Sequence, residues 1–292
     1  MPSTRDIRRR IKSIKNTSQI TKAMQMVAAS KMRKAQQSAL SGRPYATLMN
    51  EVLAEVTANA GDFTHPLMEV RVSERRAVII VSTDKGLCGA LNGNLLREAV
   101  KLDQNTTVYL TAGRKASQFI ARTKRKLAAE FTYKDTPLFS EARAISKFAQ
   151  DLFLKGEVDR VDVAFTNFVS TLNQKPEVRQ FLPLREIKSV EMDVSGEGGG
   201  GELHAGTVAF LFEPKADQVL GALLPHYLNY LIYQILLEAK ASEHSARMVA
   251  MKNATDNAKQ IIKDLTLEYN KLRQANITRE LLEITTAQMA LG

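Results

Sequence analysis

The sequence has few of the features on which several classes of protein depend. Its 292 residues include a single cysteine, Cys88, so no intrachain disulfide can form and a reducing compartment fits. A lone cysteine is most simply interpreted as a small buried side chain. No apolar run approaches the roughly 18 residues that a membrane-crossing helix needs. We therefore expect neither a disulfide scaffold nor a transmembrane helix, and no signal peptide or presequence is recognisable.

Catalytic and metal-binding patterns are also missing. The four histidines are scattered through the sequence, without the spacing of a metal site. No nucleophile elbow or other catalytic motif is present. Glu238 and Glu243 lie in a helical pattern among Lys240, His244 and Arg247, where solvated i,i+4 ion pairs are the simpler interpretation. We expect no catalytic residue, no cofactor site and no metal site.

One glycine-rich segment, residues 84–93, directly follows a predicted strand. Such a turn can bind phosphate through its backbone amides when it leads into a helix. However, the run DKGLCGALNG is neither a GxGxxG fingerprint nor a P-loop ending in Gly-Lys-Ser/Thr. A structural turn is therefore favoured, and a nucleotide-dependent α/β enzyme remains the alternative.

The positive charge is confined to one end of the chain. The net charge is +10, and the first 50 residues hold eleven basic residues against one acid, Asp6. Such a segment favours an acidic protein surface, nucleic acid or anionic lipid as its partner, unless it is only a solvated helix face. A nucleic-acid binder is disfavoured because Ile7, Ile11 and Ile14 form a stripe that needs burying and no aromatics are interleaved.

The two ends of the chain predict very long helices. Neither Ser3–Ser41 nor His226–Leu291 contains glycine or proline, and these segments would measure roughly 58 and 100 Å if helical. Apolar or small residues recur in steps of three and four, which favours an antiparallel coiled coil of the two ends. The C-terminal stripe is traced through Ile232, Ile235, Ala239, Ser242, Ala246, Val249, Asn253, Ala258, Ile261, Leu265, Tyr269, Leu272 and Ala275.

The middle of the chain predicts an α/β domain. A continuous apolar run at 77–81 is typical of a buried strand. Further strands are predicted at 106–111, 161–169, 178–187 and 206–212, with helices at 91–102 and 114–127 and a glycine-rich loop at 196–201. The fold class is therefore α/β plus a long antiparallel coiled coil, with a Rossmann-like domain of about five strands. The predicted domains are residues 1–60 and 215–292, paired as a shaft, and 61–214.

Three segments carry a resemblance to a known family. The runs IRRRIKSIKNTSQITKAMQMVAASKMRKAQ (7–36) and ASEHSARMVAMKNATDNAKQIIKDLTLEYNKLRQANITRELLEI (241–284) closely resemble the terminal helices of the F-type ATP synthase gamma subunit family. The run DKGLCGALN (84–92) is similar to that family's turn after its first strand. The resemblance covers the whole chain, although Thr285–Gln288 replace the glycines that the family often has near its end.

The resemblance implies a rotor shaft that couples proton flow to ATP synthesis or hydrolysis elsewhere in a complex. The implied partners are the alpha and beta subunits of a catalytic hexamer, an epsilon subunit and a membrane ring of c subunits, with one copy of this chain and no nucleic acid. The implied place is peripheral, at the cytoplasmic face of the bacterial plasma membrane. The resemblance also implies partner contacts, among them three residues of the basic face of the first helix, Lys31, Arg33 and Lys34. The other implied contacts are Met24, Arg247, Gln274, Thr278 and Glu280.

Overall fold

The computed structural model describes residues 3–42, 44–45, 47–49, 51–53, 65–71, 75–184 and 216–291. The chain divides into two compact units, each taken here by itself. The helical unit comprises Met1–Ala28 and Met248–Gly292, and the α/β unit comprises Ala29–Arg247. The predicted domain boundaries near 60 and 214, the predicted strand at 206–212 and the glycine-rich loop at 196–201 lie outside the described residues.

The helical unit is an antiparallel pair, as predicted. It consists of the first part of α1 (Thr4–Ser41) and the last part of α6 (Ala216–Leu291). Arg8 donates to the Tyr269 hydroxyl, and the hydroxyls of Thr21 and Thr255 lie 2.7 Å apart. Because a later residue of α1 meets an earlier residue of α6, the two helices run in opposite directions.

The start of α1 is capped by its own sequence. Ser3 Oγ accepts from the backbone N–H of Asp6, and Asp6 Oδ2 accepts from the N–H of Ser3, both at 3.2 Å. These hydrogen bonds to Ser3 lower the pKa of the exposed Asp6 carboxyl. The reciprocal pair satisfies two backbone donors that a helix start leaves open.

The seam of α6 in the helical unit departs in places from the predicted stripe. Asn253, Ile261 and Ala275 are exposed, which makes their assignment to the stripe wrong. From Arg273 to Met289 every side chain is exposed. The seam instead follows a regular alternation of three- and four-residue steps, as a left-handed coiled coil requires. Its buried or half-buried positions are Met251, Thr255, Ala258, Ile262, Leu265, Tyr269 and Leu272.

The α/β unit is built on one mixed sheet of five strands in the order β3-β2-β1-β4-β5. The first four strands are parallel, and β5 is antiparallel to β4. The predicted continuous apolar strand is β1, at the centre of the sheet and buried along nearly its whole length. The strands are β1 (Arg76–Val81), β2 (Thr107–Ala112), β3 (Leu127–Phe131), β4 (Arg160–Phe168) and β5 (Gln174–Leu182).

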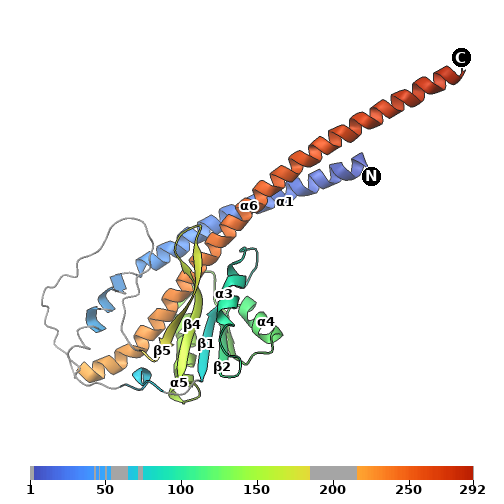
Figure 1. Cartoon of the computed structure of the whole chain (residues 1–292). Helices are drawn as coiled ribbons and strands as arrows, with labels where there is room; N and C mark the ends of the chain where they lie inside the picture. The colour runs from blue at the N-terminus through green and yellow to red at the C-terminus, as the bar shows by residue number, and fades with distance from the viewer. Residues whose placement is uncertain are drawn as a thin grey trace. The chain divides into compact units, whose positions relative to one another are not determined.

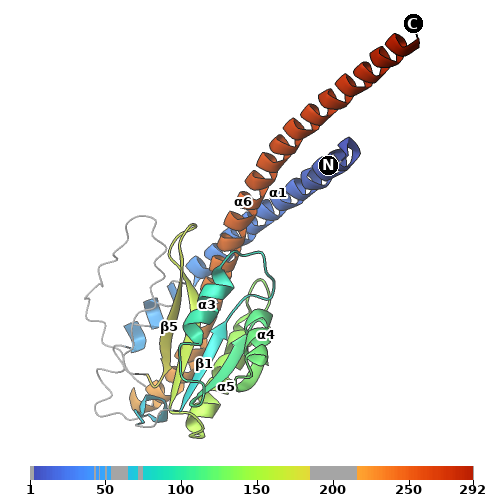
Figure 2. The same cartoon turned by 45° about the vertical axis from the view of Figure 1, so that its right-hand side comes forward.

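Helices cover both faces of this sheet (Figures 1 and 2). Alternate residues of β1 supply the two cores: Ile79 belongs to the cluster that holds α5 and α6, and Ile80 to the cluster that holds α3 and α4. The two sides follow from the strand period of two. The covering helices are α3 (Leu91–Ala99), α4 (Arg114–Arg122), α5 (Phe139–Leu154) and the part of α6 up to Arg247, with a short 3₁₀ turn η1 (Pro66–Met68).

Both helices predicted in the middle of the chain are too long, by three residues at 91–102 and by five at 114–127, and the strand β3 and the helix α5 were missed. The helix predicted at 114–127 ends at Arg122, and Leu127–Phe131 form the edge strand β3 instead. The segment LAAEF consists largely of residues that favour helices, so its propensity points the wrong way. Pairing with β2 overrides that propensity, because strand formation depends more on neighbours than on the residue alone.

Part of α6 is apolar enough to cross a membrane by length and composition. More than half of that 18-residue window, 56%, is buried inside the protein. Such burial is typical of the core helix of a globular domain. It agrees with the packing of Leu228, Ile232 and Leu236 in the core beneath the sheet.

We predict that Gly113→Ala destabilises the α/β unit by about 2 kcal/mol or more. Gly113 has φ 107°, and a Cβ there would lie 2.2 Å from the Ser82 carbonyl oxygen. The strand-to-helix turn must then move. Urea unfolding of the full-length chain measures the effect.

Gly93→Ala is the matched control, because a Cβ at Gly93 meets nothing within 4 Å. Gly93 lies in α3, where alanine is favoured over glycine by up to about 1 kcal/mol. Equal stability of the two variants would show that the turn at Gly113 is not strained.

Candidate functional site at the carboxyl ends of the strands

The strand order places a topological switch point between β1 and β4. The chain moves outward from β1 to β2 and β3, and then returns to add β4 on the other side of β1. In open α/β sheets the crevice outside the carboxyl ends at such a point is where ligands bind. The segments around this crevice begin at Ser82 after β1 and at Val169 after β4.

Helix α6 occupies this place beside β4. Ser242 Oγ donates to the Thr166 carbonyl oxygen at 2.9 Å, and Glu238 Oε1 accepts from the N–H of Phe168 at 3.4 Å. Ala241 packs against the Phe168 ring. The last residues of β4 therefore bond to a helix of the same chain.

The same helix also covers the glycine-rich turn after β1. Leu87 and Gly89 have φ near +60°, so the backbone doubles back sharply between β1 and α3. The Arg247 guanidinium donates to the carbonyl oxygens of Lys85 and Gly86, each at 3.4 Å. Carbonyl oxygens of the turn thus point toward a cation on α6. This arrangement is opposite to a phosphate cradle, which presents N–H groups.

Cys88 is the buried residue expected from the sequence. Its side chain is 2% exposed and packs with Leu91 and Ala246. Desolvation by burial raises the pKa of its thiol, so the unreactive protonated form is favoured. The thiol accepts a hydrogen bond from Asn92 Nδ2 at 3.3 Å.

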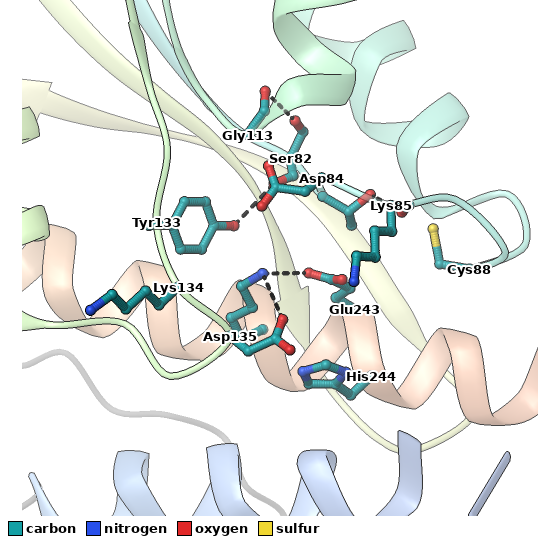
Figure 3. Close-up of polar contacts among 12 residues, drawn as sticks. Ser82, Asp84, Lys85, Cys88, Gly113, Tyr133, Lys134, Asp135, Glu243 and His244 are labelled. Atoms are coloured by element: carbon teal, nitrogen blue, oxygen red, sulfur yellow. Dashed lines mark hydrogen bonds and ion pairs between the residues drawn. The ribbon is translucent and has the colours of Figure 1, made fainter. Parts of the chain in front are cut away.

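A cluster of charged side chains lies beneath this turn (Figure 3). Lys240 Nζ lies 3.0 Å from Glu243 Oε2 and 3.8 Å from Asp135 Oδ1. Arg247 Nη2 lies 2.7 Å from the other oxygen of Glu243. The Lys240 ammonium also lies 4.5 Å from the centre of the Tyr133 ring, a cation–π contact.

The expectation that these charges are solvated is wrong. Lys240 is 1% exposed, and Glu238 and Glu243 are each 3% exposed. Every residue from Gln234 to Ala246 is buried, so α6 is enclosed on all sides here. The helical periodicity of the sequence predicts which face of α6 is apolar. It does not predict that other segments of the same chain also cover the polar face.

Burial fixes the charge state of His244 in this cluster. Desolvation is the main cause that lowers the pKa of His244 to about 4, so its ring is neutral near pH 7. Arg247 Nη1 lies 3.3 Å from His244 Nδ1. A guanidinium can only donate, so Nδ1 accepts and the proton sits on Nε2.

The structure brings only some of the predicted contact residues to this site. Arg247 takes part in it, and Lys31 of α1 forms an ion pair with Asp135. Arg33 and Lys34 are exposed on α1. In the helical unit Met24 is half-buried, whereas Gln274, Thr278 and Glu280 are exposed on α6.

The residues that sequence reasoning missed are Tyr133 and Asp135. Both lie between β3 and α5, in a segment without a motif, and β3 itself was missed. Tyr133 is 5% exposed, and its hydroxyl donates to the Ser82 carbonyl oxygen at 3.0 Å. Burial, with the nearby Glu243 carboxylate, raises the pKa of Tyr133 well above its usual value.

Space for a ligand lies elsewhere in the α/β unit. A cavity of about 470 Å³ opens at the amino-terminal ends of the strands, where Arg76, Thr107 and Arg160 line it. Arg76 and Arg160 are both paired with the buried Asp162. Among the residues that the structure describes, no group of three or more His, Cys, Asp or Glu side chains is placed to hold a metal ion.

Comparison with known proteins decides the family. A family model described as ATP synthase matches residues 3–291. The ATP synthase gamma chain of Opitutus terrae is 51% identical over 99% of both chains, and that of Methylacidiphilum infernorum is 48% identical over the full length of both. The chain belongs to the ATP synthase gamma chain family.

Solved structures of ATP synthases share this fold. The rotor of the Euglena gracilis mitochondrial enzyme gives a TM-score of 0.66 at 19% identity, covering 94% of this chain and 98% of that chain. The central stalk of the Tetrahymena thermophila mitochondrial enzyme gives 0.59 at 24% identity, covering 80% and 99%. This gamma chain is therefore a central-shaft subunit of an ATP synthase, with a five-stranded mixed sheet and long terminal helices.

We predict that His244→Gln weakens the acid sensitivity of folding. The pKa of His244 is about 4 in the folded chain and about 6.5 in an unfolded one. Between these values the unfolded state binds more protons, so the free energy of unfolding falls as the pH is lowered. From pH 7 to pH 5 this group alone removes roughly 2 kcal/mol.

The measurement is the difference in unfolding free energy between pH 7 and pH 5, compared with the parent chain. His226→Gln is the control, because His226 lies exposed on α6. The prediction fails if both glutamine variants keep the parent's pH dependence.

Proposed function

We propose that this chain works as the shaft by contact alone and has no catalytic residue of its own. The observation that carries the proposal is the occupation of the switch-point crevice by α6. A nucleotide site needs open space and free N–H groups there, whereas Ser242, Glu238 and Arg247 bond to the strand ends and the turn. The alternative of an enzyme at residues 84–93 loses its support for the same reason.

The proposed partners are the alpha and beta subunits of the catalytic hexamer, an epsilon subunit and the membrane ring of c subunits. The solved structures that share this fold support membership in such an assembly, since one is a central stalk with its c-ring and another is a rotor. We propose that each complex contains one copy of the chain and that the chain binds no nucleic acid. Burial of Ile7 in the helical unit, at 1% exposure, argues against a free basic helix that docks on nucleic acid.

The relatives named above are bacterial chains of a membrane-associated enzyme. We therefore place this chain peripherally, at the cytoplasmic face of the plasma membrane. In that position, coupled proton flow through the membrane sector drives rotation, and rotation drives ATP synthesis at the beta subunits. The reverse cycle hydrolyses ATP.

The proposed contacts with the catalytic subunits lie on both helices. Gln274, Thr278 and Glu280 belong to the exposed end of α6, where Ile277, Leu281 and Leu282 are also exposed. The stretch after Glu283 has no charge. An exposed neutral end suits a surface that must turn against its surroundings, because it forms no ion pair that holds one angle.

We predict that Met24→Lys uncouples the complex more than Met24→Ala does. The half-buried Met24 loses only packing when it becomes alanine. The lysine adds a charge that costs a few kcal/mol if it is desolvated without a partner. Reconstituted vesicles report the protons pumped per ATP hydrolysed. If the alanine and lysine variants pump the same number of protons per ATP, Met24 does not belong to the contact surface.

The basic face of α1 is tested at Arg33 and Lys34, since Lys31 already pairs with Asp135. We predict that changing both to Glu weakens assembly with the catalytic subunits, because like charges then face each other. The matched control changes the exposed Lys252 and Lys263 of α6 to Glu. If the variant with Glu at positions 33 and 34 assembles normally, the basic face of α1 is only a solvated surface.

The absence of an active site is tested at the turn. We predict that Lys85→Ala and Cys88→Ala both leave ATP hydrolysis by the assembled complex within about twofold of the parent, because neither side chain does chemistry. If either change abolishes hydrolysis while assembly stays intact, a catalytic site at residues 84–93 becomes the better account.

A further inference from the structure

Five charged side chains form a connected series within the α/β unit, which we call the charge network: Lys31, Asp135, Lys240, Glu243 and Arg247. Lys31 meets Asp135, Asp135 meets Lys240, and Glu243 lies between Lys240 and Arg247. The network begins at the surface, where the Asp135 side chain is 52% exposed, passes through the buried Lys240 and Glu243, and ends at the half-buried Arg247. It links α1, the segment after β3, and α6.

The network is also attached to the sheet. The Lys240 ammonium lies over the Tyr133 ring, 4.5 Å from its centre. The Tyr133 hydroxyl donates to the carbonyl oxygen of Ser82, the residue after β1 (Figure 3). At the other end Arg247 donates to the carbonyl oxygens of Lys85 and Gly86. The charges of α6 are thus tied by directional contacts to segments that leave the ends of β1 and β3.

These contacts add to what the surrounding apolar core does. The core also holds α6, because its side chains interdigitate with those of the sheet and α5. A buried charge adds a further constraint, because separation from its partner leaves it unpaired at low dielectric. A turn of α6 about its axis by one residue, 100°, would carry Lys240 away from Asp135 and Tyr133.

The rest of the region around Lys240 fits this reading. His244 is neutral and adds no competing charge. Ser242 and Ala241 are small, which lets α6 approach the end of β4 closely, with Ser242 Oγ at 2.9 Å from Thr166 O. Lys240 and Glu243 are therefore buried where α6 packs against the end of β4, while Asp135 is half-exposed.

We propose that the charge network fixes the rotational and axial register of α6, and through Lys31 that of α1, against the sheet. Torque between the sheet and the two helices then passes through these contacts. The inference rests on the shaft function, and it assigns Asp135, Tyr133 and Lys240 as positioning residues for rotary coupling. Their removal allows the helices to twist against the sheet under load.

The experiment uses the assembled complex with the catalytic hexamer fixed to a surface. A bead is attached to the sheet through Gln118→Cys on α4, an exposed position, since Cys88 is buried. Angular spread of the bead in the pauses between ATP-driven steps measures the twist between the sheet and the held helices. Proton pumping per ATP is measured on the same variants in vesicles.

We expect Lys240→Met to raise the angular variance at least twofold and to lower protons pumped per ATP. ATP hydrolysis without load should stay within about twofold of the parent. Lys147→Met, an exposed lysine of α5, is the control and should match the parent. A merely structural role would lower hydrolysis and pumping together and leave their ratio unchanged.

A second set of variants decides the matter if Lys240→Met does not assemble. Asp135 is half-exposed, so Asp135→Asn removes the negative charge that pairs with both lysines without burying a new group. We expect it to raise the angular variance, Asp135→Glu to restore most of the stiffness, and the exposed Asp151→Asn of α5 to have no effect.

The outcomes separate this inference from the shaft function itself. A parent bead that stays still while ATP is hydrolysed contradicts the shaft function. A parent bead that turns, with the same angular variance in Asp135→Asn, Asp135→Glu and the parent, overturns the inference and leaves the shaft function standing.

Discussion

The enclosure of one charged stretch of α6 is the constraint on which the rest of the α/β unit depends. From Gln234 to Ala246 no residue of the helix reaches solvent, yet the stretch contains two glutamates, a lysine and a histidine. Each charge needs a partner, because an isolated ion at low dielectric is strongly destabilising. Lys240, Glu243 and Arg247 pair with one another along the helix. Asp135, from a segment far away in the sequence, pairs with Lys240 as well and with Lys31 of α1, so it ties the helix to α1.

That arrangement explains why a Rossmann-like sheet serves a mechanical protein. The sheet has a switch point of the kind at which other α/β proteins bind a nucleotide, although its glycine-rich turn is not a nucleotide-binding motif. Here the place is taken by a helix of the same chain, and the turn offers carbonyl oxygens to Arg247 rather than amides to a phosphate. The same sheet can therefore hold a ligand in one protein and a packed helix in another, and fold alone does not reveal that difference.

Much of this fold could be predicted from the sequence, for reasons that are physical. The long glycine- and proline-free ends and the apolar strand at 77–81 carry strong periodic signals, and they became α1, α6 and β1. The edge strand β3 was missed because LAAEF favours a helix when it is read alone. The seam of α6 was misplaced at Asn253 because steps of three and four can be joined in more than one way along a helix rich in small residues.

The candidate site was less predictable than the fold. Lys240 and Glu243 look solvated in the sequence, since nothing in a helical pattern tells that both its faces are covered. Asp135 and Tyr133 had no signal at all, because their role comes only from the three-dimensional contact with α6. Arg247 was expected to meet a partner subunit, a prediction that remains open beside its contacts within the chain.

The central claim is that this chain transmits rotation, and rotation of its sheet is the most direct test. A fluorescent probe bound at Gln118→Cys in the assembled complex reports its orientation by polarisation while ATP is hydrolysed. The account predicts full turns in one direction, with one turn for every three ATP if the hexamer has three catalytic sites. Hydrolysis at the parent rate with a probe that keeps one orientation would contradict it.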